Sequence, residues 1–423
     1  MKHYSVKLLA TFLAVIMLMI SGGTCALAQS EGYDLVFWVY ADVVTTDVQS
    51  TAMNQIIDNF LAQDPDVKSI TMVPKNDSEL LTSLMAGVGL PDCFYASARD
   101  GYNYRQTIDL IDLSECYAQQ EEGFVEGFYP DALDAVTVDG GIWATPFISY
   151  IPVIYRNLDI LEAAGIDPAE GIPTWDRFIE QMDAVKEAGF DATHSWAAGG
   201  WYCTGSIMGS EGSNITVGVQ DGKTTIKPEQ AVRTFETLLR IQPYANNTQY
   251  GDNTALEAFK AGELAYLLDG PWSEPGIIDS GVRYDVELVP PYEVGGHTGG
   301  MQGWDWMYGV KSGDPEKDAA IARFITYLGS YESEKIWLTV VGRSVLRRDV
   351  MSEPENLLTE MAVDHAKGLE GGLMQMEFMH SNVFWPSPLG DIAPLVANGE
   401  MTPEEGAEAF VKAINSLYAE AEE

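Results

Sequence analysis

The chain has 423 residues, 46% of them hydrophobic and 11% aromatic, and its 63 acidic and 24 basic residues give a formal net charge of −39. A chain of this length and composition can bury two or three hydrophobic cores and is not a disordered polymer. Its negative charge repels phosphate backbones and anionic lipid heads, which excludes nucleic acid as an expected partner and disfavours a strongly anionic ligand. The same charge is also typical of a solvated acidic surface.

The first 28 residues are arranged as a secretory signal peptide. Two lysines precede an apolar run over residues 8–20, and Ala26-Leu27-Ala28 supplies the small residues of a cleavage site. The run has 13 residues, short of the roughly 20 that span a bilayer. We therefore expect residues 1–28 to be a signal peptide and the remaining chain to be exported, to a periplasm or to the outer cell surface.

The four cysteines leave two questions open. Cys25 is a less favoured site of lipidation, because Gly22 and Thr24 stand where that signal prefers Leu and a small residue. After cleavage Cys93, Cys116 and Cys203 remain. The sequence allows two alternatives, a disulfide between Cys93 and Cys116 or three buried free thiols. The five histidines have no metal-ligand spacing, and we expect neither a metal nor a cofactor.

Strands and helices alternate in the first part of the expected mature chain. Apolar runs predict strands over residues 34–40, 69–73 and 91–96, and helical periodicity predicts helices over 47–63 and 76–87. This alternation indicates an α/β architecture with parallel strands. In such sheets a ligand lies beyond the carboxyl ends of the strands, here Tyr40-Ala41-Asp42 and Tyr95-Ala96-Ser97.

The rest of the chain continues in the same mixed style. We expect strands near residues 142–147 and 151–156, and helices over 158–164, 173–188, 228–239, 253–261, 315–330 and 403–421. Several of these helices begin at a proline, and Thr174 is placed as an N-cap. No internal repeat and no low-complexity linker divides the sequence. Two lobes without such a linker suggest that the chain crosses between them more than once.

Five stretches, in order, resemble the motifs of bacterial extracellular solute-binding proteins of the carbohydrate type, the group that includes maltose-binding protein. They are LPD at 90–92, DGGIWATP at 139–146 with IYRN at 154–157, GID at 165–167 with PTWD at 173–176, FKAGELA at 259–265 with GPW at 270–272, and GWDWMYGV at 303–310. Cys93 and Arg156 depart from the family pattern.

The resemblance implies a two-lobed α/β periplasmic-binding-protein fold, type II-like, with a ligand cleft between lobes joined by a hinge of several crossings. It assigns residues 29–148 and 290–331 to an N-terminal lobe, and 149–289 and 332–423 to a C-terminal lobe. The crossings are expected near 147–152, 284–291 and 330–334. The implied function is that of a monomeric receptor that closes on its ligand by hinge bending and delivers it to the transmembrane permease of an ABC importer.

A neutral sugar presents apolar C–H faces and a rim of hydroxyls, so its site needs aromatic platforms together with polar groups. The resemblance favours Trp272, after Gly-Pro, and Trp385 as stacking rings. Trp304, Trp201 and Tyr202 are further candidates, because they lie in glycine-rich sequence that we expect to form turns or loops. For each ring the alternative is packing inside a lobe.

Polar candidates follow from predicted strand ends and turns. Asp42 follows the first strand, Ser97 and Arg99 follow the third, and Tyr150 stands where relatives place a polar contact. Three more polar candidates are Asp305 between two tryptophans, Asp269 before Gly-Pro-Trp, and Arg343 in a Gly-Arg-Ser turn. A surface or helix-capping role is the alternative for each.

Two other functions are alternatives to a sugar receptor. One is a receptor of the same fold for a polyamine or a peptide, since the sequence shows no cluster of Tyr with His or carboxylates that iron would need. A secreted glycan hydrolase needs a pair of carboxylates at a set separation, and 63 acids supply many accidental pairs. The sequence contains no GxSxG elbow, zinc motif or Ser/His/Asp pattern, so we expect a binding protein and no enzyme.

Overall fold

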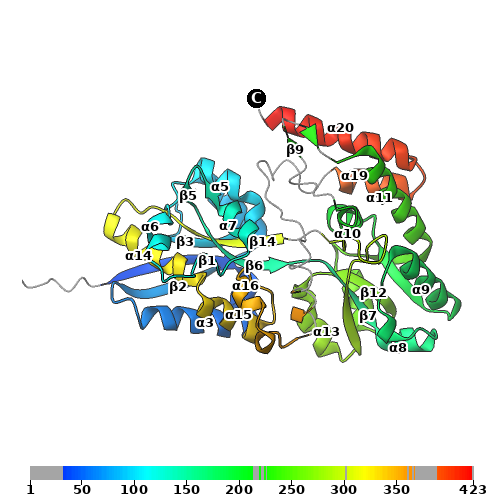
Figure 1. The fold of residues 1–423 in the computed structure, drawn as a ribbon, viewed down its shortest axis with the longest axis horizontal. Helices are drawn as coiled ribbons and strands as arrows, with labels where there is room; N and C mark the ends of the chain where they lie inside the picture. Colours follow the sequence, from blue (N-terminus) through cyan, green and yellow to red (C-terminus); the bar gives the residue numbers. More distant parts are fainter. Residues whose placement is uncertain are drawn as a thin grey trace, which may run out of the picture.

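Two five-stranded mixed sheets, each covered by helices, form the frame of the protein (Figure 1). The computed structural model describes residues 32–212, 219–220, 223–224, 226–300, 303–359, 362–363, 366 and 388–421. The expected signal peptide and Cys25 lie outside these ranges. Within them, no helix has the length and apolar character that a membrane span requires.

The sheet of the N-terminal lobe has the strand order β2-β1-β3-β14-β6. These strands are β1 (Tyr33–Tyr40), β2 (Val67–Lys75), β3 (Cys93–Ser97), β6 (Thr145–Tyr150) and β14 (Gly303–Gly309). β1 pairs in parallel with β2 and β3, and β14 pairs antiparallel with β3 and β6. The carboxyl ends of β1, β3 and β6 therefore meet at one edge of the sheet.

Helices cover both faces of this sheet. One face packs against α3 (Asp47–Leu61), α14 (Pro315–Leu328) and α15 (Tyr331–Val341), and the other against α4 (Asp77–Ala86), α5 (Gly101–Thr107) and α7 (Pro130–Val136). Side chains alternate along each strand: Phe37 and Tyr95 enter the first core, whereas Trp38 and Phe94 enter the second. Shorter elements of the lobe are α2 (Ala41–Thr45), α6 (Ser114–Ala118), α16 (Arg348–Met351), β4 (Thr137–Val138) and β5 (Gly141–Ile142).

The C-terminal lobe repeats this plan with the strand order β11-β8-β12-β7-β13. Its strands are β7 (Val153–Asn157), β8 (Asp191–Ser195), β11 (Ala245–Gln249), β12 (Leu264–Asp269) and β13 (Tyr284–Leu288), with a small hairpin of β9 (Val219–Gln220) and β10 (Lys223–Thr224). Its helices are α8 (Leu158–Ala163), α9 (Trp175–Glu187), α10 (Gly200–Gly209), α11 (Pro228–Ile241), α12 (Thr254–Lys260), α13 (Glu274–Ser280), α19 (Leu389–Ala397) and α20 (Pro403–Ala421).

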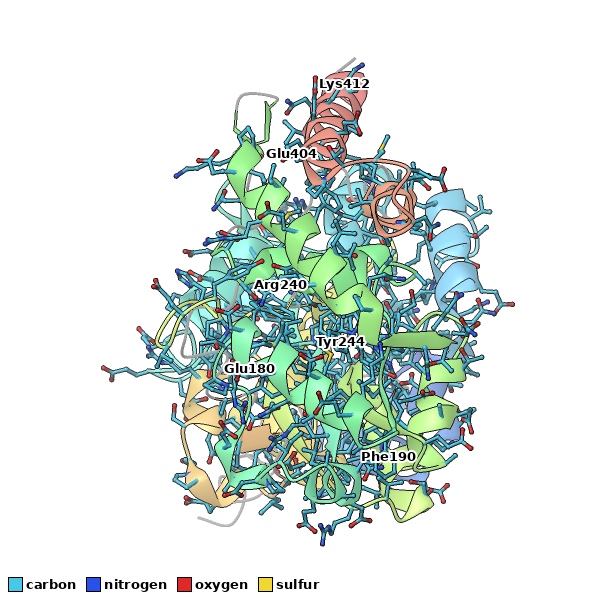
Figure 2. All side chains as sticks on the ribbon, turned by 90° about the vertical axis from the view of Figure 1, so that its right-hand side faces the viewer. Glu180, Phe190, Arg240, Tyr244, Glu404 and Lys412 are labelled. Atoms are coloured by element: carbon cyan, nitrogen blue, oxygen red, sulfur yellow. The ribbon has the colours of Figure 1, made fainter. Side chains whose placement is uncertain are left out.

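The outer helices of the C-terminal lobe are amphipathic. Figure 2 looks onto this side, where Glu180 on α9, Arg240 on α11 and Lys412 on α20 belong to the charged surface. The opposite faces of these helices bury apolar side chains such as Phe178 and Phe235 in one core. Burial of these faces is the main contribution to the stability of the lobe.

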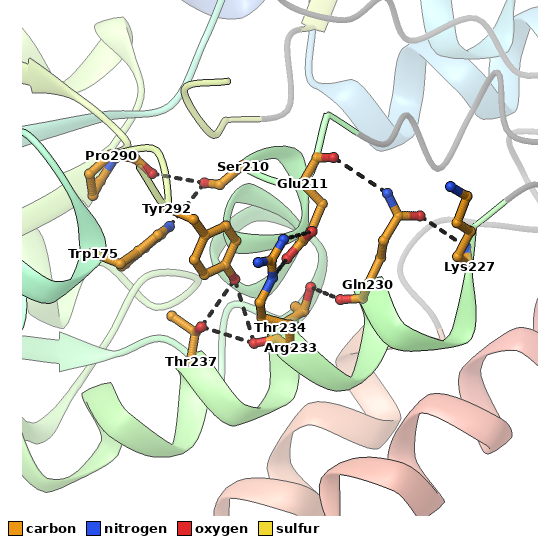
Figure 3. A network of polar contacts seen from close by, with 10 residues as sticks. All are labelled: Trp175, Ser210, Glu211, Lys227, Gln230, Arg233, Thr234, Thr237, Pro290 and Tyr292. Carbon is orange, nitrogen blue, oxygen red and sulfur yellow. Dashed lines mark hydrogen bonds and ion pairs between the residues drawn. The ribbon is translucent and has the colours of Figure 1, made fainter. Parts of the chain in front are cut away.

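The chain passes between the lobes where two of the crossings were expected. β6 ends at Tyr150 and β7 begins at Val153 in the other sheet, and β13 ends at Leu288 before β14 returns at Gly303. Figure 3 shows how the second crossing is held by the C-terminal lobe: Ser210 Oγ donates to the Pro290 carbonyl at 2.9 Å, and the Arg233 guanidinium lies 4.4 Å from the Tyr292 ring centroid.

The third crossing is not at residues 330–334, which corrects the expected boundary at 332. α15 packs against α3, and Trp337 and Leu338 are buried in the core of the N-terminal lobe. The segment after α15 also pairs with β6, since Ser149 N donates to Ser344 O at 3.1 Å. α16 follows in the same core, whereas α19 belongs to the core of the C-terminal lobe.

The described cysteines are all free thiols. Cys93 and Cys203 are buried and Cys116 is half-buried. The structure therefore has free thiols and no Cys93–Cys116 disulfide. Burial raises the pKa of the Cys93 and Cys203 thiols well above the ordinary value, which keeps them protonated and unreactive.

Candidate ligand-binding site

A cavity of about 420 Å³ lies between the two lobes. The N-terminal lobe contributes the ends of β1, β3, β6 and β14 and the turn after α15, and the C-terminal lobe contributes the turn after β12. The lining residues are Tyr40, Asp42, Tyr95, Ser97, Ile148, Tyr150, Pro271, Trp272, Asp305 and Arg343. The volume and the mixture of aromatic and polar groups are typical of a small-molecule site.

One end of the cavity carries an ion pair. Asp42 lies in the first turn of α2, directly after β1, and its Oδ2 lies 3.5 Å from Arg343 Nη1. Gln49 joins the pair by donating to Asp42 and accepting from Arg343, at 3.3 and 3.5 Å. Arg343 is well buried whereas Asp42 is half-exposed. The pair therefore offers a ligand both guanidinium donors and carboxylate acceptors.

A second polar group lies on β14. Tyr95 donates its hydroxyl to Asp305 Oδ2 at 3.0 Å, and the Ser97 backbone N–H donates to the Tyr40 hydroxyl at 2.8 Å. Burial, followed by the nearby Asp305 carboxylate, raises the pKa of Tyr95 well above its ordinary value. The Tyr95 hydroxyl thus stays protonated and remains a donor that fixes the orientation of Asp305.

Two aromatic rings, one from each lobe, meet at the mouth of the cavity. Tyr150 ends β6, and its ring centroid lies 5.6 Å from that of Trp272 at an interplanar angle of 73°. Trp272 is 38% exposed, unusually open for a tryptophan. An exposed indole of this kind can stack on the apolar face of a bound ring.

Both rings lie against glycines. A methyl carbon on Gly270 would lie 2.3 Å from carbons of the Trp272 ring, and one on Gly303 would lie 1.9 Å from the Tyr150 ring. Such distances are far below van der Waals contact, so only glycine leaves room for either ring. The backbone of β14 and the backbone at the end of β12 therefore determine where the two platforms stand.

Six of the predicted site residues come together in this cavity: Asp42, Ser97, Tyr150, Trp272, Asp305 and Arg343. Tyr202 lies behind Trp272, with its ring 5.7 Å away and 6% of its surface exposed. Asp269 is buried beneath the same turn. The side chains of Arg99 and Trp201, and all of Trp385, lie outside the described part of the chain.

The segment that carries Trp304 is not the glycine-rich turn that we expected. It is strand β14, and alternation along this strand directs Trp304, Trp306 and Tyr308 into one core while Asp305 faces the cavity. Trp304 is only 3% exposed. The structure therefore places it inside the lobe and away from the cavity wall.

Four residues that line the cavity were not among the predicted site residues: Tyr40, Tyr95, Ile148 and Pro271. Tyr40 and Tyr95 were already in the strand ends named as the ligand edge, and their rings lie 5.0 Å apart. The strand-end rule could have found them, because it applies to every side chain that follows a parallel strand. Among the described residues, no cluster of His, Cys, Asp and Glu side chains could hold a metal ion.

These features together define a class: a two-lobed α/β solute-binding protein with its site between the lobes. The profile of the bacterial extracellular solute-binding protein family matches residues 55–355. The chain belongs to this family, whose members are exported binding proteins.

Individual relatives agree with this assignment. The chain is 28% identical over 295 residues to a lactose-binding protein of Rhizobium radiobacter, covering 64% of this chain and 65% of the relative. It is 27% identical over 202 residues to the sn-glycerol-3-phosphate-binding periplasmic protein UgpB of Agrobacterium fabrum, covering 45% of each. The matched region thus spans about half to two thirds of the length of these relatives.

A solved structure shows the same fold over almost the whole chain. It is the cyclic alpha-maltosyl-1,6-maltose binding protein from Arthrobacter globiformis, which superimposes with a TM-score of 0.76 and covers 92% of this chain and 100% of that one. The sequence identity is 18%, so the likeness concerns the fold and not the ligand.

Proposed function

We propose that the protein is the extracytoplasmic receptor of an ABC importer, and that it binds a sugar or short oligosaccharide between its two lobes. The observation that supports this proposal is that aromatic rings and polar groups together line the cavity. Exposed Trp272 and half-buried Tyr150 offer apolar ring faces, while Asp42, Asp305 and Arg343 offer acceptors and donors for hydroxyl groups. This is the combination that a neutral polyhydroxylated ring needs.

One relative supports the same ligand class, because it is a lactose-binding protein. The UgpB relative binds sn-glycerol 3-phosphate, and Arg343 is a cation that a phosphate could approach. However, Arg343 already faces Asp42, and Asp305 adds a second carboxylate to the wall. The cavity wall thus has one cation and two carboxylates, and this charge suits a neutral ligand better than a phosphate.

A thermal-shift panel tests the proposal. The purified mature chain is mixed with lactose, maltose, maltotriose, sn-glycerol 3-phosphate, spermidine and a short peptide. We expect a sugar to raise the melting temperature and to quench tryptophan fluorescence, because a ligand that binds only the folded state stabilises it. A shift with spermidine or the peptide and none with any sugar would refute the sugar assignment and favour the alternative receptors.

Substitution of Trp272 locates the binding site. Trp272→Ala should weaken binding of the active sugar by more than about tenfold, because a stacked aromatic platform is typically an energetic hot spot. The matched control is Trp143→Ala, a half-buried ring on the far side of the N-terminal lobe. Unchanged affinity in Trp272→Ala would remove Trp272 from the binding site, and a lowered melting temperature would then assign it to packing.

The remaining parts of the proposal concern the mature protein. We propose that it acts as a monomer in the periplasm or at the outer cell surface, with residues 1–28 removed, and that it has no catalytic activity. Mass spectrometry of the exported protein tests the cleavage site and also detects a lipid on Cys25. Hydrolysis of a bound disaccharide by the purified chain would contradict the receptor assignment.

A further inference from the structure

Trp272, the aromatic platform of the C-terminal lobe, lies in a turn that begins at the buried carboxylate of Asp269. Asp269 is the last residue of β12, pairs with Val153 of β7, and is 4% exposed. Pro271–Ser273 follow as a single turn of 3₁₀ helix, and α13 starts at Glu274. A carboxylate with so little exposure needs several hydrogen-bond donors to remain stable.

The donors to Asp269 come from both sides of Trp272. Gly270 donates its backbone N–H to Oδ1 at 2.7 Å, and Ser273 donates its hydroxyl to Oδ2 at 2.8 Å. The indole N–H of Trp272, the only donor of that side chain, also favours the ionised form of this carboxyl and so opposes the rise that burial causes in the pKa of Asp269. The carboxylate therefore holds the residues before and after the platform and attracts the indole N–H.

The opposite side of the turn is also fixed. Tyr155 of β7 donates its hydroxyl to the Gly270 carbonyl at 2.9 Å, and the Ser273 N–H donates to the same carbonyl at 3.2 Å. The indole rests on the bare Cα of Gly270. With the backbone held in this way, the orientation of the indole depends on the Asp269 contacts together with the neighbouring rings of Tyr150 and Tyr202.

Four titratable groups from neighbouring elements face Asp269. They are Tyr155 from β7, Tyr202 and Cys203 from α10, and Tyr250 from the loop after β11. Burial raises the pKa of each of them well above its ordinary value, so all four stay neutral at physiological pH. Desolvation also raises the pKa of Asp269, to about 6. Asp269 is therefore the group in this cluster that changes charge in the range an exported protein meets.

We propose that Asp269 is the positioning residue of the Trp272 platform, and that its protonation loosens the ring and weakens ligand binding in acid. The second part rests on the proposed function. A protonated Asp269 can still accept from Gly270 and donate to Ser273, but it no longer accepts from Ser273 and the indole together. An asparagine at this position resembles the protonated acid in being neutral and in having one carbonyl acceptor and a donor group in place of the second carboxylate oxygen, although its amide has two N–H donors where the acid has one O–H.

Fluorine NMR of the full mature chain labelled with 5-fluorotryptophan tests the first part without any ligand. The Trp272 resonance is assigned by its loss in Trp272→Phe. We expect this resonance to titrate between about pH 4.5 and 8 with a midpoint near the pKa of Asp269. In Asp269→Asn we expect it to be independent of pH and to lie where the wild-type resonance lies in acid.

Glu274→Gln is the matched control, because Glu274 is another buried acid next to the turn and accepts from Tyr284 instead. It should leave the Trp272 titration intact. A Trp272 resonance that does not titrate in the wild type, or that titrates equally in Asp269→Asn, would overturn the proposal. If Asp269→Asn does not fold, a wild-type resonance that does not titrate still overturns the proposal, and one that titrates with a midpoint near 6 in both the wild type and Glu274→Gln supports it.

Ligand binding tests the second part with lactose and maltotriose as probes. We expect the dissociation constant of the wild type to rise about three- to tenfold from pH 7.5 to 5, the equivalent of one hydrogen bond, and that of Asp269→Asn to stay constant. An equal pH dependence in both proteins would contradict the second part. If neither sugar binds the wild type, the proposed function fails on these probes, while the NMR result still decides whether Asp269 positions Trp272.

Discussion

Replacing Gly270 by alanine should displace the Trp272 platform and leave the fold intact. The backbone at Gly270 is extended, with φ −95° and ψ 175°, so alanine can adopt it without strain. The added methyl carbon would nevertheless lie 2.3–2.5 Å from three carbons of the indole. Normal contact between carbon atoms is about 3.5 Å, so the ring must retreat by roughly 1 Å or turn out of its plane.

The expected cost is the stacking interaction with the ligand. We expect binding of the sugar identified by the thermal-shift panel to weaken by about 1 to 2 kcal/mol, or roughly five- to thirtyfold. Isothermal titration calorimetry measures this loss. Gly276→Ala in α13 is the control, because its methyl would meet only the Lys260 side chain at 3.9 Å.

A double-mutant cycle decides whether the effect passes through the ring. Gly270→Ala should have no further effect on affinity in the Trp272→Ala background, because the ring that it displaces is already absent. Wild-type affinity in Gly270→Ala, or equal losses in both backgrounds, would refute the reasoning. A large fall in melting temperature would show instead that the methyl disturbs the β12 turn as a whole.

Two further predictions concern buried titratable groups. Burial lowers the pKa of His194 to about 4, so the stability that its neutral form contributes is lost as pH falls from about 6.5 through 4, by about 3 kcal/mol. Urea unfolding should show this loss in the wild type and less of it in His194→Gln; equal slopes would contradict it. Burial raises the pKa of Glu334 well above its ordinary value, so its contribution to stability is present at low pH and is lost as pH rises through that raised pKa. Glu334→Gln should therefore have at least the wild-type free energy of unfolding at pH 5, and a higher one than the wild type at pH 8. A variant less stable at both pH values would indicate an ionised Glu334 paired with Arg347.

Periodicity predicted the parallel strands of the N-terminal lobe and most of the longer helices, whereas the parallel strands β8, β11 and β12 of the C-terminal lobe were not predicted. Thr174 caps α9 as predicted, and Asn76, at the predicted start of α4, caps that helix; each accepts a hydrogen bond from a backbone N–H in the first turn. β14 was missed because its glycines suggested a turn, and because a strand buried on both faces lacks the apolar–polar alternation of an exposed one. The assignment of α15 failed for another reason, since its amphipathic pattern shows that it packs but not against which lobe.

Local patterns likewise predicted some residues of the site, whereas others depend on how distant segments pair. The resemblance supplied Tyr150, and the strand-end rule found Asp42 and Ser97, because a chain leaving a parallel strand must emerge at the ligand edge. It could not separate Asp305 from Trp304, since which of two neighbours faces the cavity depends on the register of β14 with β3, fixed by Asp305 opposite Ser97. Long-range pairing of this kind is not encoded in a local pattern.

The placement of the two platforms shows how the site depends on the hinge. Tyr150 is the last residue of β6 before the first crossing, and its ring lies on Gly303, the first residue of β14 after the second crossing. The ring is thus held between the two crossing segments, while Trp272 is held on Gly270 by the C-terminal lobe alone. Any rotation of one lobe about the crossings must change the 5.6 Å separation of the two rings. A ligand that contacts both rings therefore binds one arrangement of the lobes better than others, and this differential affinity is what couples binding to closure.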